Sequence, residues 1–257
     1  MKAKFGDNVV FSRAQNLERV SGQVATIQGV GSKTILLVLI TLISALATMF
    51  ILGPLQVLSA YFIIWIITFV LLMIMSFNPT AARVLAIPYA ILEGMTVGAI
   101  SGVVAIAIPD AGLLFPYADL LIPGLALSIT MTIFLGASVL YATGVIRVSG
   151  FFRRFMYTLL LGVVITSLVV MIAGFFNSQI YELFYGVNSG IALLISIIMV
   201  IISSLYVVIS LDNATMIVDA GMDKTFEWYA AFGILLNIIW LYYEVLRLLI
   251  ILSQRDR

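Results

Sequence analysis

The chain alternates between long apolar runs and short breaks that are polar or contain Gly and Pro. A membrane-spanning helix needs about 20 mostly apolar residues. The runs are rich in Leu, Ile, Val, Ala and Met, and they are longer than the alternating segments of about ten residues that form membrane barrels. The pattern therefore predicts an all-α membrane protein with seven transmembrane helices, at 34–53, 55–76, 84–108, 119–142, 155–176, 189–211 and 228–252.

The predicted organisation has three parts. Residues 1–33 are polar and predict a cytoplasmic N-terminal tail, residues 34–252 form the seven-helix transmembrane domain, and residues 253–257 form a short C-terminal tail. The Gly53-Pro54 pair separates the first two runs and predicts a tight helical hairpin. The alternative is that one run is re-entrant, which would place both ends of the chain in the cytoplasm.

Composition supports lipid as the solvent for most of the chain. Of the 257 residues, 63% are hydrophobic and 10% are charged, and the mean hydropathy is +1.21. A soluble domain is about half apolar and a quarter charged. The net charge of +1 gives no reason to expect nucleic acid as a partner. The chain lacks Cys and His, so no thiolate metal site or Ser-His-acid arrangement can form, and we expect neither a cofactor nor an enzyme.

Lys and Arg predict the orientation. Basic residues flank the breaks on one side of the predicted membrane, in the tail and at Arg83, Arg147, Arg153, Arg154 and Lys224. The connections on the other side carry acids instead, at Asp110, Asp119 and Glu182. Since cytoplasmic loops are enriched in Lys and Arg, the N-terminus should lie in the cytoplasm. We expect a multi-pass membrane protein.

The last run carries two charges, Glu244 and Arg247, near its middle. An ionised group at that depth costs about 2.5–3.5 kcal/mol on insertion scales. With Gly233, Asn237 and Trp240 they form one helical stripe, which should face the bundle interior. Two simpler interpretations stay open, in which Arg247 reaches the headgroups or pairs with Glu244 within the helix.

The third run holds another intramembrane acid, Glu93, beside glycines at spacing four. Gly94, Gly98 and Gly102 would let a second helix approach closely. That stripe predicts packing within the bundle, or a surface for a membrane-protein partner. Glu93 is either a member of a polar network or a partnered structural carboxyl.

Other charged residues lie near the predicted span ends. Asp212 is an interfacial cap if the sixth run ends there, or an intramembrane acid if the helix continues through Val218. Arg83 is either a marker of the cytoplasmic side or a counter-ion for an acid at that mouth. The Arg153-Arg154 pair suits an anchor at lipid phosphates. The acids Asp219, Asp223 and Glu227 suggest a solvated loop.

Several stretches resemble the Bax inhibitor-1-like family, also called the transmembrane Bax inhibitor motif family, and its bacterial branch in particular. They are Asn78-Pro79 with Arg83, PYAILEG at 88–94, LYATGVIRV at 140–148 with FRR at 152–154, and above all FEWYAAFGILLNIIWLYYEVLRLL at 226–249. The resemblance covers most of the chain beyond the tail. It implies a fold in which six helices wrap a central seventh, the C-terminal helix, and a location in the bacterial cytoplasmic membrane.

The resemblance also implies a function, a pH-sensitive calcium leak channel. Two acids on helices six and seven would share a proton and gate the pore, and they correspond here to Asp212 and Glu244, with Arg83 as the pairing cation. Calcium would follow the same two acids as permeant ion. Members of this family that bind membrane proteases or stress-pathway proteins imply an alternative, a non-conducting membrane regulator.

Overall fold

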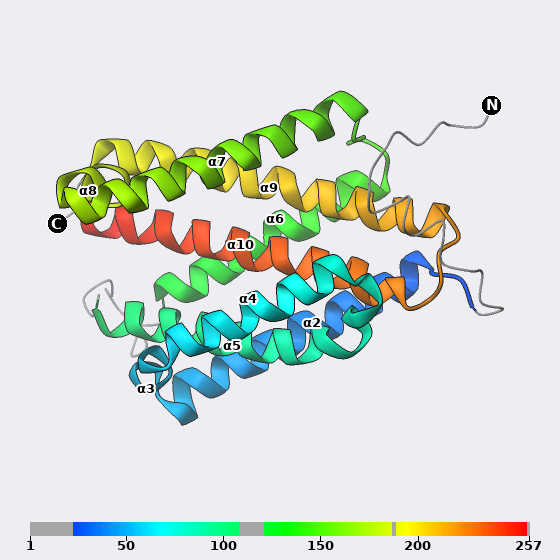
Figure 1. Cartoon of the computed structure of the whole chain (residues 1–257), viewed down its shortest axis with the longest axis horizontal. Coiled ribbons are helices and arrows are strands. Elements are labelled where there is room, and N and C mark those ends of the chain that lie inside the picture. The colour runs from blue at the N-terminus through cyan, green and yellow to red at the C-terminus, as the bar shows by residue number, and fades with distance from the viewer. Residues whose placement is uncertain (1–22, 108–120, 187–188, 256–257) are drawn as a thin grey trace.

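The computed structural model describes residues 23–107, 121–186 and 189–255, and within them the chain is helical (Figure 1). Most of the N-terminal tail and the loop acids Asp110 and Asp119 lie outside these residues. The elements are α2 (Ile27–Ala47), η1 (Thr48–Leu52), α3 (Pro54–Ser59), α4 (Tyr61–Phe77), η2 (Pro79–Ala81), α5 (Ala82–Ala107), α6 (Leu121–Ala142), α7 (Gly150–Phe176), α8 (Ser178–Tyr185), α9 (Gly190–Asp219) and α10 (Phe226–Arg255).

Six helical segments of the described chain are long and apolar enough to cross a membrane. The second predicted span differs, because the run at 55–76 is interrupted at Ala60, whose backbone leaves the helical region (φ −93°, ψ 2°). The helix after this interruption, α4, has 17 residues and rises only about 25 Å, against a hydrocarbon core of about 30 Å. The multi-pass membrane architecture is therefore confirmed, and the seventh crossing stays a prediction.

Two helix ends lie more than five residues beyond the predicted boundaries. The first helix begins at Ile27 rather than at residue 34, because the Thr26 side chain caps it by accepting a hydrogen bond from the Gly29 amide. Residues up to 33 therefore do not all belong to a tail. The sixth predicted helix continues to Asp219. Asp212 consequently lies inside α9, which is the second of the two interpretations left open by the sequence.

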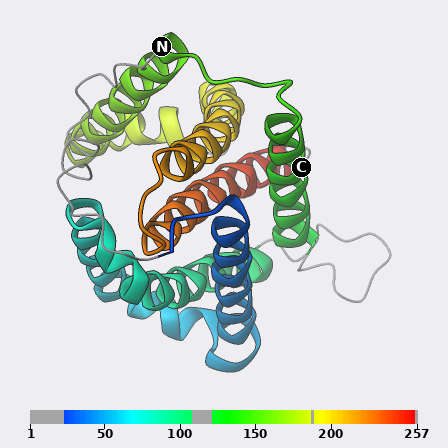
Figure 2. The same cartoon turned by 90° about the vertical axis from the view of Figure 1, so that its right-hand side faces the viewer.

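Helix α10 packs against α2, α5, α6 and α9, and Figure 2 shows these four around it. Its buried side chains belong to the three main hydrophobic clusters, with Leu235 in the first, Ile238 in the second and Leu241 in the third. The residues of its polar stripe, from Gly233 to Arg247, are only half-buried, so the predicted interior position of that stripe stays a prediction. The predicted fold has six helices around α10, and contacts of α10 with more than these four stay a prediction.

The glycine stripe of α5 is occupied within the bundle. A Cβ added at Gly94 or Gly98 would collide with the backbone oxygens of Thr41 and Ala45 on α2, and one at Gly102 would lie 2.7 Å from Pro54 Cβ. The packing interpretation is therefore confirmed. This stripe is not a free surface for another membrane protein.

We expect Gly98→Ala to lower the free energy of unfolding by about 1–3 kcal/mol, as overpacked cores do, because α2 and α5 must separate. The matched control is Gly162→Ala on α7, where an added Cβ meets no atom within 4 Å and helix propensity favours alanine. Thermal melts in detergent should show a lower midpoint for Gly98→Ala only. Equal midpoints for the two variants would contradict the close approach.

Candidate functional site

Asp212 lies in α9 and is bound by two side chains from neighbouring elements. Its carboxylate forms an ion pair with the Arg153 guanidinium of α7, and its Oδ1 accepts a hydrogen bond from Tyr141 Oη at 3.1 Å. Both charged side chains are largely buried, with 14% of Asp212 and 23% of Arg153 exposed. Arg153 is therefore the counter-ion of this intramembrane acid, and its predicted role as a lipid anchor is wrong.

A cavity of about 810 Å³ lies beside Asp212. Its wall comes from α2, α6, α9, α10 and the 144–148 segment, and it includes the polar groups Ser138, Tyr141, Arg147, Asp212 and Thr215. The cavity lies at the end of the bundle where α2 begins and where α9 turns into α10. The Asp212 carboxylate therefore lies on the wall of a cavity at this end of the bundle.

Glu244 does not reach Asp212. The rings of Tyr206 on α9 and Trp240 on α10 are 5.5 Å apart and mark one level of this antiparallel pair. Asp212 lies six residues from Tyr206 toward the turn, and Glu244 lies four residues from Trp240 in the other direction. At about 1.5 Å per residue, the two acids are about 15 Å apart along the axes. Since a shared proton requires hydrogen-bond contact, they form no dyad in this structure.

Glu244 has instead a local partner on its own helix. Trp240 Nε1 donates a hydrogen bond to Glu244 Oε1 at 3.1 Å. The second oxygen, Oε2, is buried and has no hydrogen-bond donor in the described chain. An acceptor left in this state is costly unless another group satisfies it. Oε2 is therefore the oxygen of this carboxyl that the described chain leaves without a donor.

The other polar residues of α10 have separate roles. Arg247 donates a hydrogen bond to the Phe184 carbonyl at 2.8 Å, and its guanidinium lies 4.6 Å from the centre of the Tyr185 ring. It thus binds the C-terminal end of α8, where a cation is favourable, rather than pairing with Glu244. Asn237 donates to the Gly233 carbonyl of its own helix.

Arg83 lies at the same end of the bundle but not at Asp212. The positive charge of Arg83 instead lowers the pKa of Asp223, in the turn between α9 and α10. Hydrogen bonds from the Thr225 side chain and amide, at 2.7 and 2.8 Å, together with the Arg83 guanidinium, hold the pKa of Asp223 below its ordinary value. Arg83 is exposed and forms no ion pair with Asp212 in the described chain, where Arg153 holds that carboxylate instead.

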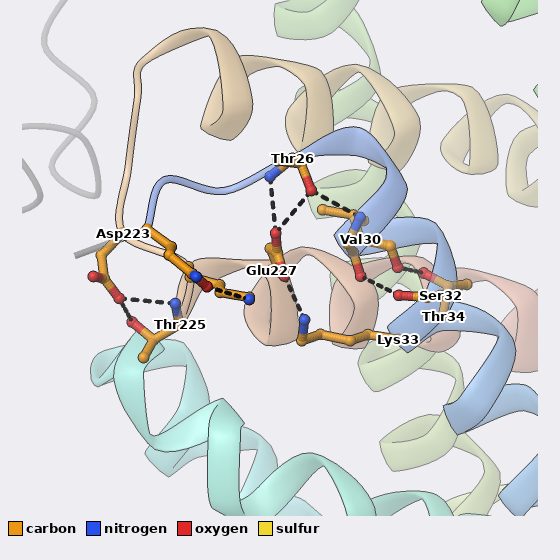
Figure 3. Close-up of polar contacts among 11 residues, drawn as sticks. Thr26, Val30, Ser32, Lys33, Thr34, Asp223, Thr225 and Glu227 are labelled. Atoms are coloured by element: carbon orange, nitrogen blue, oxygen red, sulfur yellow. Dashed lines mark hydrogen bonds and ion pairs between the residues drawn. The ribbon is translucent and has the colours of Figure 1, made fainter.

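The largest difference from the sequence interpretation is Glu227, which is only 1% exposed rather than solvated. Its carboxylate forms an ion pair with Lys33 of α2. It also accepts hydrogen bonds from the Thr26 amide at 2.9 Å and the Thr26 hydroxyl at 3.1 Å. Figure 3 shows this carboxylate between the two α2 residues. Glu227 therefore fixes the start of α10 to the start of α2.

Backbone pairing extends the same junction. The Ala25 amide donates to the Met222 carbonyl at 2.8 Å, and the Lys224 amide donates to the Gln23 carbonyl at 2.9 Å. These bonds place residues 23–25 antiparallel to the α9–α10 turn. The chain just before α2 is thus tied to the turn that connects α9, which carries Asp212, to α10.

Glu93 belongs to a hydroxyl network. Tyr89 Oη donates to Glu93 Oε1 at 2.9 Å, and the Thr96 hydroxyl lies 3.1 Å from Glu93 Oε2. Thr96 is also 3.2 Å from Tyr243 Oη of α10. The network interpretation of Glu93 is therefore the one that the structure supports.

Three important residues of this region escaped sequence reasoning, namely Arg153, Tyr141 and Glu227. A signal existed for Arg153, because charge bias put it on the side of the membrane where an extended α9 brings Asp212. No comparable signal singled it out from Arg147 or Arg154, and none separated Glu227 from its acidic neighbours.

The described residues contain no group of three or more acids that could hold a metal ion. Comparison with family models gives a match over residues 7–254 to the family described as Bax inhibitor 1 like. Comparisons with curated proteins and with solved structures give no match. The family match covers nearly the whole chain, including every residue of the candidate site. The chain therefore belongs to the Bax inhibitor 1 like family.

Proposed function

We propose that this protein is a pH-sensitive cation leak channel, with calcium among its permeant ions. The observation that carries the proposal is the Asp212 carboxylate on the wall of the 810 Å³ cavity. Carboxylate oxygens are the ligands that Ca²⁺ prefers. In the state described by the structure, the Arg153 guanidinium occupies this carboxylate. A permeant cation must displace it, so this state is closed at Asp212.

Glu244 supplies the second step of the path. It lies about 15 Å deeper along the α9–α10 pair and keeps one buried oxygen without a donor. Two single carboxylates at different depths hold an ion weakly, and conduction needs sites that an ion can leave. The proposal therefore treats Asp212 and Glu244 as successive sites, in place of one acid pair that shares a proton.

The sign of the pH dependence depends on the carboxylates. A protonated carboxyl carries no charge and attracts no cation, so acid closes the path and deprotonation favours conduction. Because the chain has no His, we assign this sensitivity to the acids.

Orientation and location are part of the proposal. Lys33, Arg83, Arg147, Arg153 and Lys224 all belong to the end of the bundle where α2 begins. By the bias of Lys and Arg toward the cytoplasm, the Asp212 cavity opens to the cytoplasm of a bacterial cell and the N-terminus lies on the same side. The alternative of a non-conducting regulator loses its predicted docking surface, because α2 and Pro54 fill the glycine stripe.

The experiment is calcium influx into liposomes that contain the purified protein and an internal calcium dye. We expect Asp212→Asn to reduce the influx at neutral pH at least about tenfold, the factor for 1.4 kcal/mol of lost ion binding, and to flatten the pH profile. Glu244→Gln should also reduce the influx. The control is Glu182→Gln, on the exposed surface of α8. If both acid variants keep the wild-type influx and pH profile, the proposal is wrong.

A further inference from the structure

Glu93 is an intramembrane acid that the proposed path does not use. It lies on α5, and the groups around it are hydroxyls from α5 and α10. Tyr89 and Thr96 are buried, with 3% and 4% of their surfaces exposed. Asp212 forms an ion pair with Arg153, and Glu227 forms one with Lys33. In the described chain, no cation forms an ion pair with Glu93.

The titratable groups that face Glu93 are three tyrosines, each from a different helix. They are Tyr89 of α5, Tyr61 of α4 and Tyr243 of α10. From α2 the nearby side chains are hydroxyls, with Ser44 donating to the Ile91 carbonyl at 2.7 Å. Helix α3 has no titratable side chain, and Tyr141 of α6 is engaged by Asp212. The charged neighbours of Tyr243 are engaged elsewhere, Glu244 by Trp240 and Arg247 by Phe184.

The protons of this cluster can be counted at Thr96. Its hydroxyl lies 2.8 Å from the Glu93 carbonyl, 3.1 Å from Glu93 Oε2 and 3.2 Å from Tyr243 Oη. A hydroxyl has one proton to donate and two lone pairs to accept with. The carbonyl can only accept, and it is the nearest of the three oxygens. If Thr96 donates to it, then Glu93 Oε2 and Tyr243 Oη must both donate to Thr96.

Glu93 Oε2 can donate only when it carries a proton. In that form every group in the cluster is satisfied, because Tyr89 donates to the remaining oxygen, Oε1, at 2.9 Å. An ionised Glu93 would instead hold its charge on hydroxyl donors alone. An ionised group within a span is costly, and no cation of the described chain forms an ion pair with Glu93.

We propose that Glu93, Tyr89, Thr96 and Tyr243 form a proton-binding site within the membrane, in which a neutral Glu93 carboxyl links α5 to α10. The bound ligand is a proton, and the link runs from Glu93 Oε2 through the Thr96 hydroxyl to Tyr243. Loss of this proton leaves a carboxylate at the α5–α10 interface and removes one hydrogen bond from the link. The site is separate from Asp212 and Glu244.

The test is infrared difference spectroscopy of the folded protein across pH, which detects the carbonyl stretch of protonated carboxyls. At neutral pH, Glu93→Gln should lose one such band relative to the wild type, and the control Glu182→Gln should lose none. Tyr89→Phe should keep the band but shift it to higher frequency, because Oε1 loses its donor. This second variant keeps the test valid if Glu93→Gln does not fold.

Two results would overturn the site. One is a neutral-pH spectrum in which Glu93→Gln lacks no protonated-carboxyl band, and the other is a Tyr89→Phe spectrum with no shift. The first would mean that Glu93 is ionised and that hydroxyl donors alone hold its charge, and the second would mean that Tyr89 does not donate to a protonated Glu93. Calcium influx is not the readout, so the outcome is independent of whether the protein conducts.

Discussion

Replacing Lys33 with methionine is expected to lower the free energy of unfolding by about 3–5 kcal/mol, the cost of removing one partner from a buried ion pair. Glu227 is 1% exposed, so the carboxylate that remains would be buried with the Thr26 donors and no cation. Thermal or denaturant unfolding in detergent would measure the loss. Lys33→Met/Glu227→Leu should recover most of it, because apolar groups can replace a buried pair at little cost.

The matched control is Lys224→Met. Lys224 is exposed and, among the described residues, its ammonium hydrogen-bonds only the Gln23 side chain, so its loss should change stability by less than about 0.5 kcal/mol. The pH slope adds a second check. Acid should partly rescue Lys33→Met, because a proton neutralises the carboxylate that the folded state buries without a cation. If Lys224→Met lowers the free energy of unfolding as much as Lys33→Met does, the role assigned to Glu227 is wrong.

The helices were largely predictable because lipid imposes a long apolar run on each crossing. The ends were less predictable, and α2 shows why. Its first turns include Lys33, a residue that the hydropathy pattern assigns to the tail, and Lys33 fits there because it meets Glu227, 194 positions later. Periodicity along one segment carries no information on such a distant partner.

The candidate site was partly predictable for a related reason. The sequence identified Glu244, Glu93 and Arg247 as intramembrane charges, because each interrupts an apolar run, and it left Asp212 open between an interfacial cap and an intramembrane acid. Their partners depend on depth. Once α9 is known to extend to Asp219, counting back from the turn separates Asp212 from Glu244 by about ten residues' rise, roughly 15 Å. The family resemblance does not say where α9 ends, so it could not show that Asp212 and Glu244 lie at different depths.

Arg153→Met is expected to raise calcium influx at neutral pH by roughly 5- to 30-fold, the factor that corresponds to one or two kcal/mol. The guanidinium is the group that a cation must displace from Asp212, and both side chains are more than three-quarters buried. Calcium-dye influx into liposomes would measure the increase. Acid should abolish it, because a protonated Asp212 attracts no cation with or without Arg153.

Arg154→Met provides the control, since Arg154 is the exposed neighbour of Arg153 on the same turn of α7. It removes the same charge from the same end of the bundle, so a general change in surface potential would raise influx in both variants. Asp212→Asn/Arg153→Met separates the remaining alternatives. If Arg153 acts by occupying Asp212, the double variant falls to the level of Asp212→Asn. If influx stays high without the carboxylate, loss of Arg153 has opened the bundle by loosening α7, and Asp212 is no ion site.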